Sequence, residues 1–516
     1  MRKNSVFLLA CISVSFAVLS RAPSHCVEIT RTKYTSYSHY LQGLVHLRDG
    51  NLTKAQYEFE RTIEHDTNAV AAYRELILIY LQTGRIEKAR ALANIFSGLA
   101  DNLETKLFLG TFYVIINDTT SAINVYDEVL KEQPDNKDAI LTLASIYNQI
   151  DPEKALYYWD SYIKFSPDES EAYYRKALTL IKLKKNNEAE ELLKSAIKNK
   201  PEDVLLHLTL SELYEHQKQF VPAAEELHRT AQLEPNNHVL HMRAGGLYFL
   251  AGEHAKAEES FRKAIEIAPR ESSAFFWLAI LYEEKKLWHE AIQYIRKSID
   301  LQPDVVSYLR LSYYYTQVKD APKAIDTLQR ALKKDAKSPE IHFFLGLGYM
   351  DIKRYKKAES HLLECIKLNP QLSEAYFYLG VIYDQTKKFD KAVTHFRKAI
   401  KLNPKNSTAM NYLGYSFAER GMELDEAAEL IESALEMEPE NGAYLDSLGW
   451  VYFKKGDYVK AKKYLLEAAA KLEDPVVYEH MGDIETALGN DGPAQQWYRK
   501  ALTLDPENKK LKRKIN

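Results

Sequence analysis

The side chains that could bind a metal or act as nucleophiles are few and scattered. His238 and His241 lie three residues apart, so on a helix they would share one face and could act as two metal ligands. The three cysteines, Cys11, Cys26 and Cys365, show no metal-binding or redox spacing. The sequence has no phosphate-binding glycine loop and no G-x-S-x-G, H-E-x-x-H or C-x-x-C motif. It therefore predicts a protein that is not an enzyme and that uses no cofactor and no metal.

The overall composition is that of an ordinary folded protein. The chain has 516 residues, of which 46% are hydrophobic and 27% are charged. Its formal net charge is −3, whereas a nucleic-acid-binding protein is usually basic, so nucleic acid is not an expected partner. Tyrosine is frequent, with 35 residues, as expected if one or two tyrosines recur in a repeated unit.

One stretch, from Tyr376 to Pro404, shows the repeated unit most clearly. Its pattern is an aromatic residue, a Leu-Gly pair, a tyrosine, an alanine, an aromatic residue, an alanine and a proline. In order, these residues are Tyr376, Leu379, Gly380, Tyr383, Ala392, Phe396, Ala399 and Pro404. The small residues let two helices approach closely, the large ones fill the space between those contacts, and the proline ends the second helix. Such a unit cannot bury its apolar face alone, so it must stack on its neighbours.

The pattern recurs along most of the chain. The position of Pro404 recurs in fourteen units at intervals of 33 to 35 residues, and the position of Ala392 is an alanine in every unit. The unit resembles the tetratricopeptide repeat, a helix–turn–helix of 34 residues. The resemblance implies an all-α fold, a right-handed superhelical solenoid of about fourteen repeats. No linker-like segment interrupts the pattern, so we expect one continuous array over residues 36–507.

The two ends of the chain differ from the array. Residues 1–24 combine two early cations with an apolar run at 6–19, which suits a signal peptide and is short for a membrane-spanning helix. Cleavage after Ser20 or after Ser24 would fit, and an uncleaved signal anchor is the alternative. Residues 25–35 are expected to be a short linker. The basic tail 508–516 is expected to form a capping helix, with contact to an anionic surface as the alternative.

Lipid attachment at a cysteine is a separate question. The residues before Cys11 resemble a lipobox, but only five apolar residues precede this cysteine. Cys26 is better placed, but His25 before it is not the small residue that lipoprotein processing requires. Membrane association through a lipid or a signal anchor stays open. Cys365 occupies the second small position of its repeat and is expected to be a buried small hydrophobe.

The outermost units fit the pattern less well than the others. His46 replaces the usual tyrosine in the first unit, Ile77 replaces the usual glycine in the second, and Glu485 replaces the usual tyrosine in the last. Weak terminal repeats are expected of a capped solenoid, whose end faces meet water.

His241 stands at the first aromatic position of its unit, so packing explains this histidine better than metal binding does.

In this family the concave surface is lined mainly by the first helix of each unit, at its second, fifth, ninth and twelfth positions. Between residues 240 and 450 the fifth and ninth positions are mostly apolar or aromatic, which predicts a groove that binds an extended or helical apolar segment of another protein. The candidate residues are Met242, Phe276, Ile280, Leu309, Tyr313, Phe343, Leu347, Phe377, Val381, Asn411, Tyr415, Asp446 and Trp450. The alternative is that these side chains are half-buried packing between repeats.

Two binding modes of this family do not fit these residues. The carboxylate clamp for chaperone tails needs lysine and asparagine at inner positions of consecutive units, where this chain has phenylalanine, leucine and tyrosine. The ladder of the O-GlcNAc transferase array needs asparagine at the sixth position. The residues at that position are Arg175, Thr209, Arg243, Trp277, Arg310, Phe344, Tyr378 and Tyr412.

The C-terminal region has a closer resemblance. Residues 411–506, which contain the segment AYLDSLGWVYFKKGDY, are similar to the C-terminal half of bacterial exported repeat proteins. Those relatives are outer-membrane lipoproteins that scaffold periplasmic assemblies, some as adaptors for carboxy-terminal processing proteases. The resemblance implies an exported scaffold or adaptor, in the periplasm or at the outer membrane, whose partners are proteins or peptides, such as an envelope protease or a secretion or assembly complex. A component of exopolysaccharide or cell-wall assembly and a cytoplasmic scaffold are the alternatives.

Overall fold

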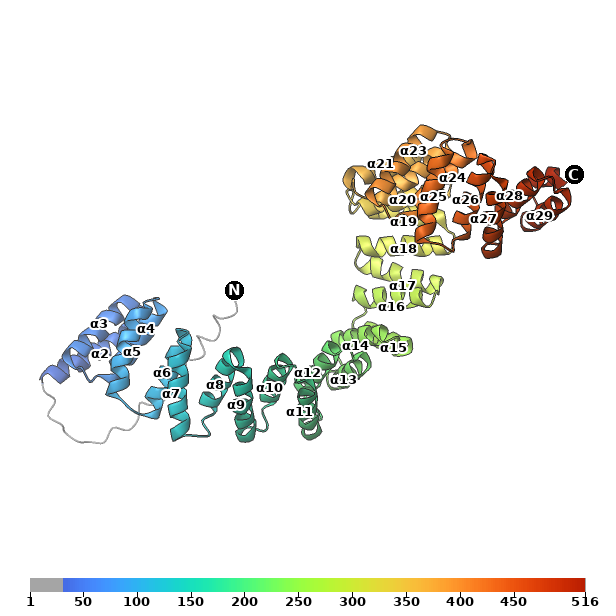
Figure 1. The fold of residues 1–516 in the computed structure, drawn as a ribbon. Coiled ribbons are helices and arrows are strands. Elements are labelled where there is room, and N and C mark those ends of the chain that lie inside the picture. The colour runs from blue at the N-terminus through green and yellow to red at the C-terminus, as the bar shows by residue number, and fades with distance from the viewer. Residues whose placement is uncertain (1–30, 516) are drawn as a thin grey trace. The chain divides into compact units, whose positions relative to one another are not determined.

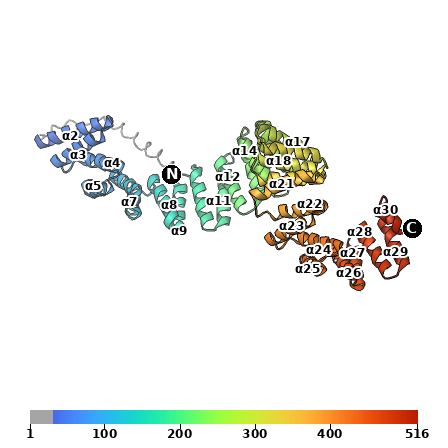
Figure 2. The same cartoon turned by 90° about the horizontal axis from the view of Figure 1, so that it is seen from above.

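The computed structural model describes residues 31–515, and in that range the chain forms helices joined by short turns (Figures 1 and 2). The predicted signal segment with its cleavage sites, Cys11 and Cys26 lie outside the described residues. The chain divides into two compact units, residues 1–219 and residues 220–516, and each unit is described by itself. Among the described helices, none combines the length and the apolar character needed to cross a membrane.

Unit 1 contains the first eleven described helices. They are α2 (Arg31–Arg48), α3 (Leu52–His65), α4 (Val70–Gln82), α5 (Ile86–Leu99), α6 (Leu103–Ile115), α7 (Thr119–Glu132), α8 (Lys137–Ile150), α9 (Pro152–Phe165), α10 (Ser170–Lys182), α11 (Asn186–Asn199) and α12 (Val204–His216). Even-numbered helices are the first helices of the predicted repeats, and odd-numbered helices are the second ones.

Unit 2 contains the remaining helices. They are α13 (Phe220–Leu233), α14 (His238–Leu250), α15 (His254–Ile267), α16 (Ser272–Glu284), α17 (Trp288–Leu301), α18 (Val305–Gln317), α19 (Ala321–Leu332), α20 (Pro339–Asp351), α21 (Tyr355–Leu368), α22 (Ser373–Gln385), α23 (Phe389–Leu402), α24 (Ser407–Arg420), α25 (Leu424–Met437), α26 (Gly442–Lys455), α27 (Tyr458–Lys471), α28 (Pro475–Ala487), α29 (Asp491–Leu504) and α30 (Lys509–Ile515). Helices α2 to α29 correspond to the fourteen predicted helix pairs, which confirms the all-α repeat fold.

The turns between helices have a recurring chemistry. Many first helices begin at a capping side chain: Asn406, for example, accepts a hydrogen bond from the backbone N–H of Ala409 at the start of α24. Most turns inside a repeat have a residue in the left-handed region, such as Gly252 (φ 77°) or Lys353 (φ 57°), whereas the turn between α8 and α9 passes through Asp151 at φ −152°. Each turn therefore reverses the chain over a few residues and places the two helices side by side.

The Leu-Gly pair is explained by the packing inside each repeat. A Cβ atom added to Gly380 would lie 2.6 Å from the ring of Phe396, sixteen residues later on the second helix, so only glycine fits there. In the second repeat the two sizes are exchanged. Ile77 takes the glycine position, Ala93 takes the position of the ring, and both are fully buried in one cluster. The departure noted at Ile77 is thus compensated within its own repeat.

At both ends of the array, segments outside the predicted repeats form helices. Helix α2 begins at Arg31, inside the segment 25–35 that was predicted to be a linker. The Oγ atom of Ser36 is already part of the packing, since it donates a hydrogen bond to the carbonyl oxygen of Thr62 at 3.1 Å. At the other end the basic tail contains α30, which packs on α29 and is visible beside it in Figure 2.

Candidate partner-binding face

The predicted site residues all lie in unit 2, at matching positions of seven consecutive first helices. Counted from the first residue of each helix, seven of them are at the fifth position and six are at the ninth position of the even-numbered helices α14 to α26. We call the surface formed by the fifth, sixth and ninth positions of the even-numbered helices α14 to α28 the first-helix face. The predicted residues therefore occupy two recurring positions on consecutive first helices.

Most of the predicted residues are covered by their neighbours. Ile280, Phe377, Asp446 and Trp450 are buried. Tyr313 is exposed. The other eight are half-buried: Met242, Phe276, Leu309, Phe343, Leu347, Val381, Asn411 and Tyr415. Several aromatic members, among them Phe276, Phe343 and Tyr415, pack against the hydrophobic core that runs from α16 to α26.

The fifth position has a specific packing role, because its side chain meets the sixth position of the next first helix. Phe343 contacts Tyr378 with ring centroids 5.8 Å apart, and Phe377 contacts Tyr412 at 5.3 Å. In the same register, the guanidinium group of Arg310 lies 5.7 Å from the ring centroid of Phe276. These fifth-position rings thus take part in the packing between consecutive repeats, which was the alternative interpretation of their pattern.

The sixth position carries the more exposed rings of this face. Trp277 is 37% exposed, Phe344 is 43% exposed and Tyr412 is 45% exposed, and Tyr313 at a ninth position reaches 45%. From the sequence, these sixth-position residues argued only against an asparagine ladder and were not among the predicted binding residues. The signal that could have identified them was already there: an aromatic residue at the sixth position of four of the helices between α16 and α24. Exposed rings thus recur at the sixth position of this face.

Towards its C-terminal end the face becomes polar. The Nδ1 atom of His480 lies 2.9 Å from a carboxylate oxygen of Asp446, and both residues are buried. This pair has the fifth-to-sixth register of the aromatic pairs. Trp450 stacks on His480 with ring centroids 3.9 Å apart, and its Nε1–H donates to a carboxylate oxygen of Glu419 at 2.6 Å. Burial, together with the charges of Glu419 and Asp446, raises the pKa of Tyr415.

The last helix continues the same register. The Nζ atom of Lys514, the sixth residue of α30, donates to Glu479 at 2.8 Å and also contacts Asp483. Lys510 donates a second bond to Glu479 at 2.8 Å. Burial alone would raise the pKa of Glu479, but the hydrogen bonds from the two lysines outweigh burial and lower it. Helix α30 therefore covers the last repeat with matched charge.

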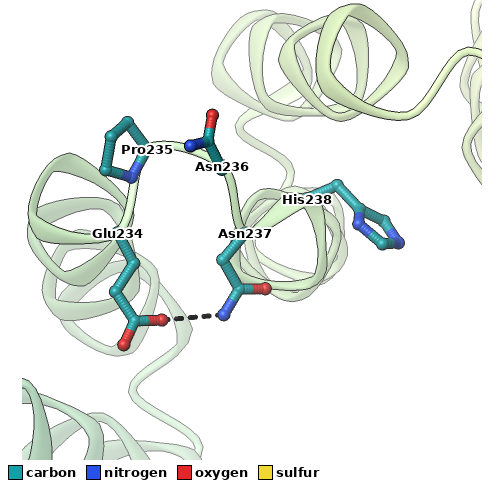
Figure 3. Close-up of a pocket in the computed structure, with 5 residues that line it drawn as sticks. All are labelled: Glu234, Pro235, Asn236, Asn237 and His238. Atoms are coloured by element: carbon teal, nitrogen blue, oxygen red, sulfur yellow. Dashed lines mark hydrogen bonds between the residues drawn. The ribbon is translucent and has the colours of Figure 1, made fainter.

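The structure has an open depression elsewhere in unit 2, at the turn before α14. It encloses about 420 Å³ and is lined by Glu234, Pro235, Asn236, Asn237 and His238 (Figure 3). The Nδ2 group of Asn237 donates to Glu234 at 2.8 Å, and the Oδ1 atom of Asn237 caps α14. These polar groups serve the turn itself, so the depression is explained by local structure.

The residues considered for metal or thiol chemistry have structural surroundings. His238 lies at that turn, whereas His241 is buried in α14, and burial lowers the pKa of His241. Within residues 31–515, no group of three or more histidine, cysteine, aspartate or glutamate side chains could hold a metal. Cys365 is fully buried, and burial raises the pKa of its thiol to about 11. The thiol is therefore protonated and shielded at neutral pH.

Family models match most of the array. Models described as tetratricopeptide repeat match residues 40–96, 180–246, 223–305, 339–406 and 422–508, which together exceed half of the chain. The chain belongs to the tetratricopeptide repeat family. A model described as anaphase-promoting complex, cyclosome, subunit 3 matches residues 116–196. Tetratricopeptide repeats generally mediate protein–protein interactions, and their fold is typical of non-enzymatic scaffolds.

Curated relatives come from distant organisms and match in part. The chain is 26% identical over 156 residues to tetratricopeptide repeat-containing protein trd-1 of Caenorhabditis elegans, covering 30% of this chain and 20% of that protein. It is 22% identical over 253 residues to TPR repeat-containing protein MJ1428 of Methanocaldococcus jannaschii, covering 48% and 41%. It is 21% identical over 323 residues to a BBSome complex member BBS4 homolog of Drosophila melanogaster, covering 59% and 66%. The chain thus spans less than half the length of the first two.

Two solved structures are similar to this chain at low sequence identity. A tetratricopeptide repeat protein from Parabacteroides merdae is 17% identical, with a TM-score of 0.41, over 47% of this chain and 97% of that chain. The Cut9 and Hcn1 hetero-tetramer structure matches with 16% identity and a TM-score of 0.39, over 88% of this chain and 97% of that chain.

Proposed function

We propose that this tetratricopeptide repeat protein is a non-enzymatic scaffold or adaptor that captures a segment of another protein on the first-helix face of unit 2. One observation supports this most directly. Trp277, Phe344 and Tyr412 keep 37%, 43% and 45% of their surface exposed at the same position of different repeats. Exposed rings reduce solubility unless a partner covers them, and rigid aromatic side chains are frequent anchors of protein interfaces.

Affinity capture with a matched pair of triple variants tests the proposal. The first variant replaces Trp277, Phe344 and Tyr412 with serine. The second replaces three equally exposed side chains of second helices, Leu363 (44%), Leu466 (44%) and Met437 (42%), with serine.

We expect the first variant to lose the partners that wild-type protein captures from cross-linked cells and the second to keep them. Circular dichroism of both variants should show unchanged helix content. If both variants capture the same partners as the wild type, the first-helix face is not the binding surface.

We further propose that the scaffold works in the bacterial cell envelope, after export. Support comes from the basic start and the apolar run at residues 6–19, and from the resemblance of residues 411–506 to exported repeat proteins. That resemblance also makes an envelope protease or a secretion or assembly complex the proposed partner class.

Mass spectrometry of the protein from its own cells tests the location. A first residue at Arg21 or His25 supports export with cleavage, and a lipid on Cys26 supports a membrane-attached form. An unprocessed Met1 together with cytosolic partners would refute export and leave the scaffold function unaffected.

A further inference from the structure

One position of the first-helix face carries no side chain. Gly246 is the ninth residue of α14, and the ninth residue is larger in each of the other first helices that form this face. Those residues are Ile280, Tyr313, Leu347, Val381, Tyr415, Trp450 and Asp483. A Cβ atom built on Gly246 would meet no atom within 4 Å, so open space lies beside this position. The face therefore has a recess at α14, where the other repeats have a side chain.

The fold does not require a glycine at this position. Gly246 lies in the middle of a helix and does not have a positive φ, and glycine is less favourable than alanine in a helix interior. Its neighbour Gly245 is different, because the ring of Phe261 leaves no room for a Cβ atom there. Among the described glycines that lie more than two residues from either end of a helix, only Gly246 meets nothing within 4 Å. A stability cost without a packing reason indicates that the open space itself has a use.

The walls of the recess are mostly apolar. On a helix surface the nearest neighbours of a residue are those three and four positions away. For Gly246 these residues are Met242, Arg243, Phe249 and Leu250, of which three are apolar. Leu250 is 63% exposed, and Met242 and Phe249 are half-buried. The apolar walls therefore remain accessible to a ligand.

Trp277 joins the recess to the exposed rings of the first-helix face. The centroid of its ring lies 5.9 Å from that of Phe249, and 37% of the residue stays exposed. Because Phe249 follows Gly246 by three residues on α14, Trp277 stands at the edge of the recess. Two rings beside one opening favour a third ring, because aromatic side chains attract one another in edge-to-face and offset arrangements beyond simple burial.

We propose that the recess over Gly246 is a specificity pocket that takes one aromatic side chain of the captured segment. This inference rests on the proposed function and adds the chemistry of the ligand. An aromatic side chain seated there would contact the rings of Phe249 and Trp277. An aliphatic side chain would bury the same apolar walls without the contacts between rings, so it should bind more weakly.

Two small amides test the pocket with full-length protein labelled with 5-fluorotryptophan. The fluorine resonance of Trp277 is identified as the one that disappears in Trp277→Phe. Its shift is followed during titration with N-acetylphenylalaninamide or N-acetylleucinamide, up to about 20 mM, because ligands of this size bind in the millimolar range.

A matched pair of variants provides the control. Gly246→Leu fills the recess with a side chain. Gly98→Leu makes the same change at an exposed position of α5, where an added Cβ atom also meets nothing within 4 Å. Urea unfolding of each variant shows whether the fold is retained.

We expect the phenylalanine amide to shift the Trp277 resonance with a dissociation constant about fivefold lower than that of the leucine amide. Gly246→Leu should abolish the saturable shift, whereas Gly98→Leu should keep it. The unfolding midpoint of Gly246→Leu should be no lower than that of the wild type, because the new side chain enters open space and leucine favours the helix.

Several results would overturn the inference. Equal affinity for the two amides would refute selection of a ring, and a shift that survives Gly246→Leu would place the binding elsewhere. A lower unfolding midpoint for Gly246→Leu would contradict the open space, and the absence of any shift would refute the pocket. In each case the capture experiment with the triple variants would still decide the proposed function separately.

Discussion

The rings of Phe377 and Tyr412 meet edge to face across the junction between two consecutive repeats, with centroids 5.3 Å apart. The two partners differ in exposure, since Phe377 is 9% exposed and Tyr412 is 45% exposed. The fifth position of a first helix thus joins two repeats, whereas the sixth position of the next one also meets solvent. Substitutions at the two positions should therefore separate stability from binding.

Replacing Phe377 with serine should lower the stability of the surrounding repeats by about 3 kcal/mol, because a buried ring is lost. Replacing Tyr412 with serine should cost less than about 1 kcal/mol, because this ring is partly solvated already. Amide hydrogen exchange of α22 and α24 would measure both effects as free energies of opening. Equal losses at the two positions would contradict the proposed division between packing and binding.

Two adjacent glycines of α14 provide a second, internally controlled prediction. A Cβ atom on Gly245 would lie 2.6 Å from the ring of Phe261, whereas one on Gly246 would meet no atom within 4 Å. Gly245→Ala should therefore destabilise the protein by about 2 kcal/mol through overpacking. Gly246→Ala should stabilise it by about 0.5–1 kcal/mol, because alanine favours the helix.

Urea unfolding followed by circular dichroism would show the two glycine variants shifting the midpoint in opposite directions. Both substitutions add the same methyl group to the same helix, so helix propensity cancels in the comparison. A shift of both midpoints in the same direction would mean that the close approach between Gly245 and Phe261 does not limit the packing.

The fold could be predicted from the sequence because the residues that pack against each other lie within one repeat, at a fixed spacing. The spacing of sixteen residues between Gly380 and Phe396 is a contact between two helices of one unit, and it recurs in register. Ile77 departs from the pattern, but the residue at that spacing is Ala93, which is small enough to leave room for it. A pattern of sizes within one unit therefore predicts which elements form and which faces meet.

The candidate site could be predicted only in part. Periodicity predicted that Phe343 and Phe377 take the same position on their helices, but it does not show how one repeat packs against the next. In the structure Phe343 and Phe377 contact the next first helix, and Phe344 and Tyr412 at the sixth position are more exposed. The contact of Lys514 with Glu479 likewise joins residues 35 positions apart, and no local rule pairs a charged tail with one particular carboxylate.

A histidine pair predicts how unit 2 responds to acid. The Nδ1 atoms of His342 and His361 lie 3.1 Å apart, and His361 stacks on Tyr349. Burial, then the charges of His342 and Lys357, lower the pKa of His361 below its ordinary value of 6.5. The unfolded chain therefore binds a proton more readily, so the stabilising contribution is complete above pH 6.5 and is lost as the pH falls below 6.5 and through the lowered pKa of the folded state.

His361→Phe should reduce this loss, since phenylalanine keeps the stacking and binds no proton. Hydrogen exchange of α20 and α21 at pH 7.5 and pH 5.5, converted to free energies of opening, would measure the effect. Helices α24 and α25 of the same molecule serve as the internal control. An equal decline in wild type and variant would show that another group governs the response to acid.

The pair of Asp446 and His480 should behave as a polar version of an aromatic pair. Asp446→Ala would leave the buried imidazole without its acceptor at 2.9 Å and should cost about 1–3 kcal/mol. The double variant Asp446→Phe with His480→Tyr copies the pair of Phe377 and Tyr412 and should recover at least half of that loss. The rate of native-state proteolysis in the turn at residues 472–474 would rank the three proteins. A double variant cleaved faster than Asp446→Ala would contradict the equivalence of the two pairs.

The contact between the fifth position of one first helix and the sixth position of the next also limits how such a protein can be recombined. A single repeat removed at its natural boundaries carries one residue of the contact with the preceding repeat and one residue of the contact with the following repeat. Both contacts are therefore broken. If that repeat is moved into another array, its fifth-position residue (Phe or Asp) meets the sixth-position residue (Tyr, Arg or His) of a new neighbour. The two residues were then not selected to pack against each other. Repeats exchanged as adjacent pairs keep one complete junction between them, so the smallest part of this protein that can be transferred with its packing intact is two repeats rather than one.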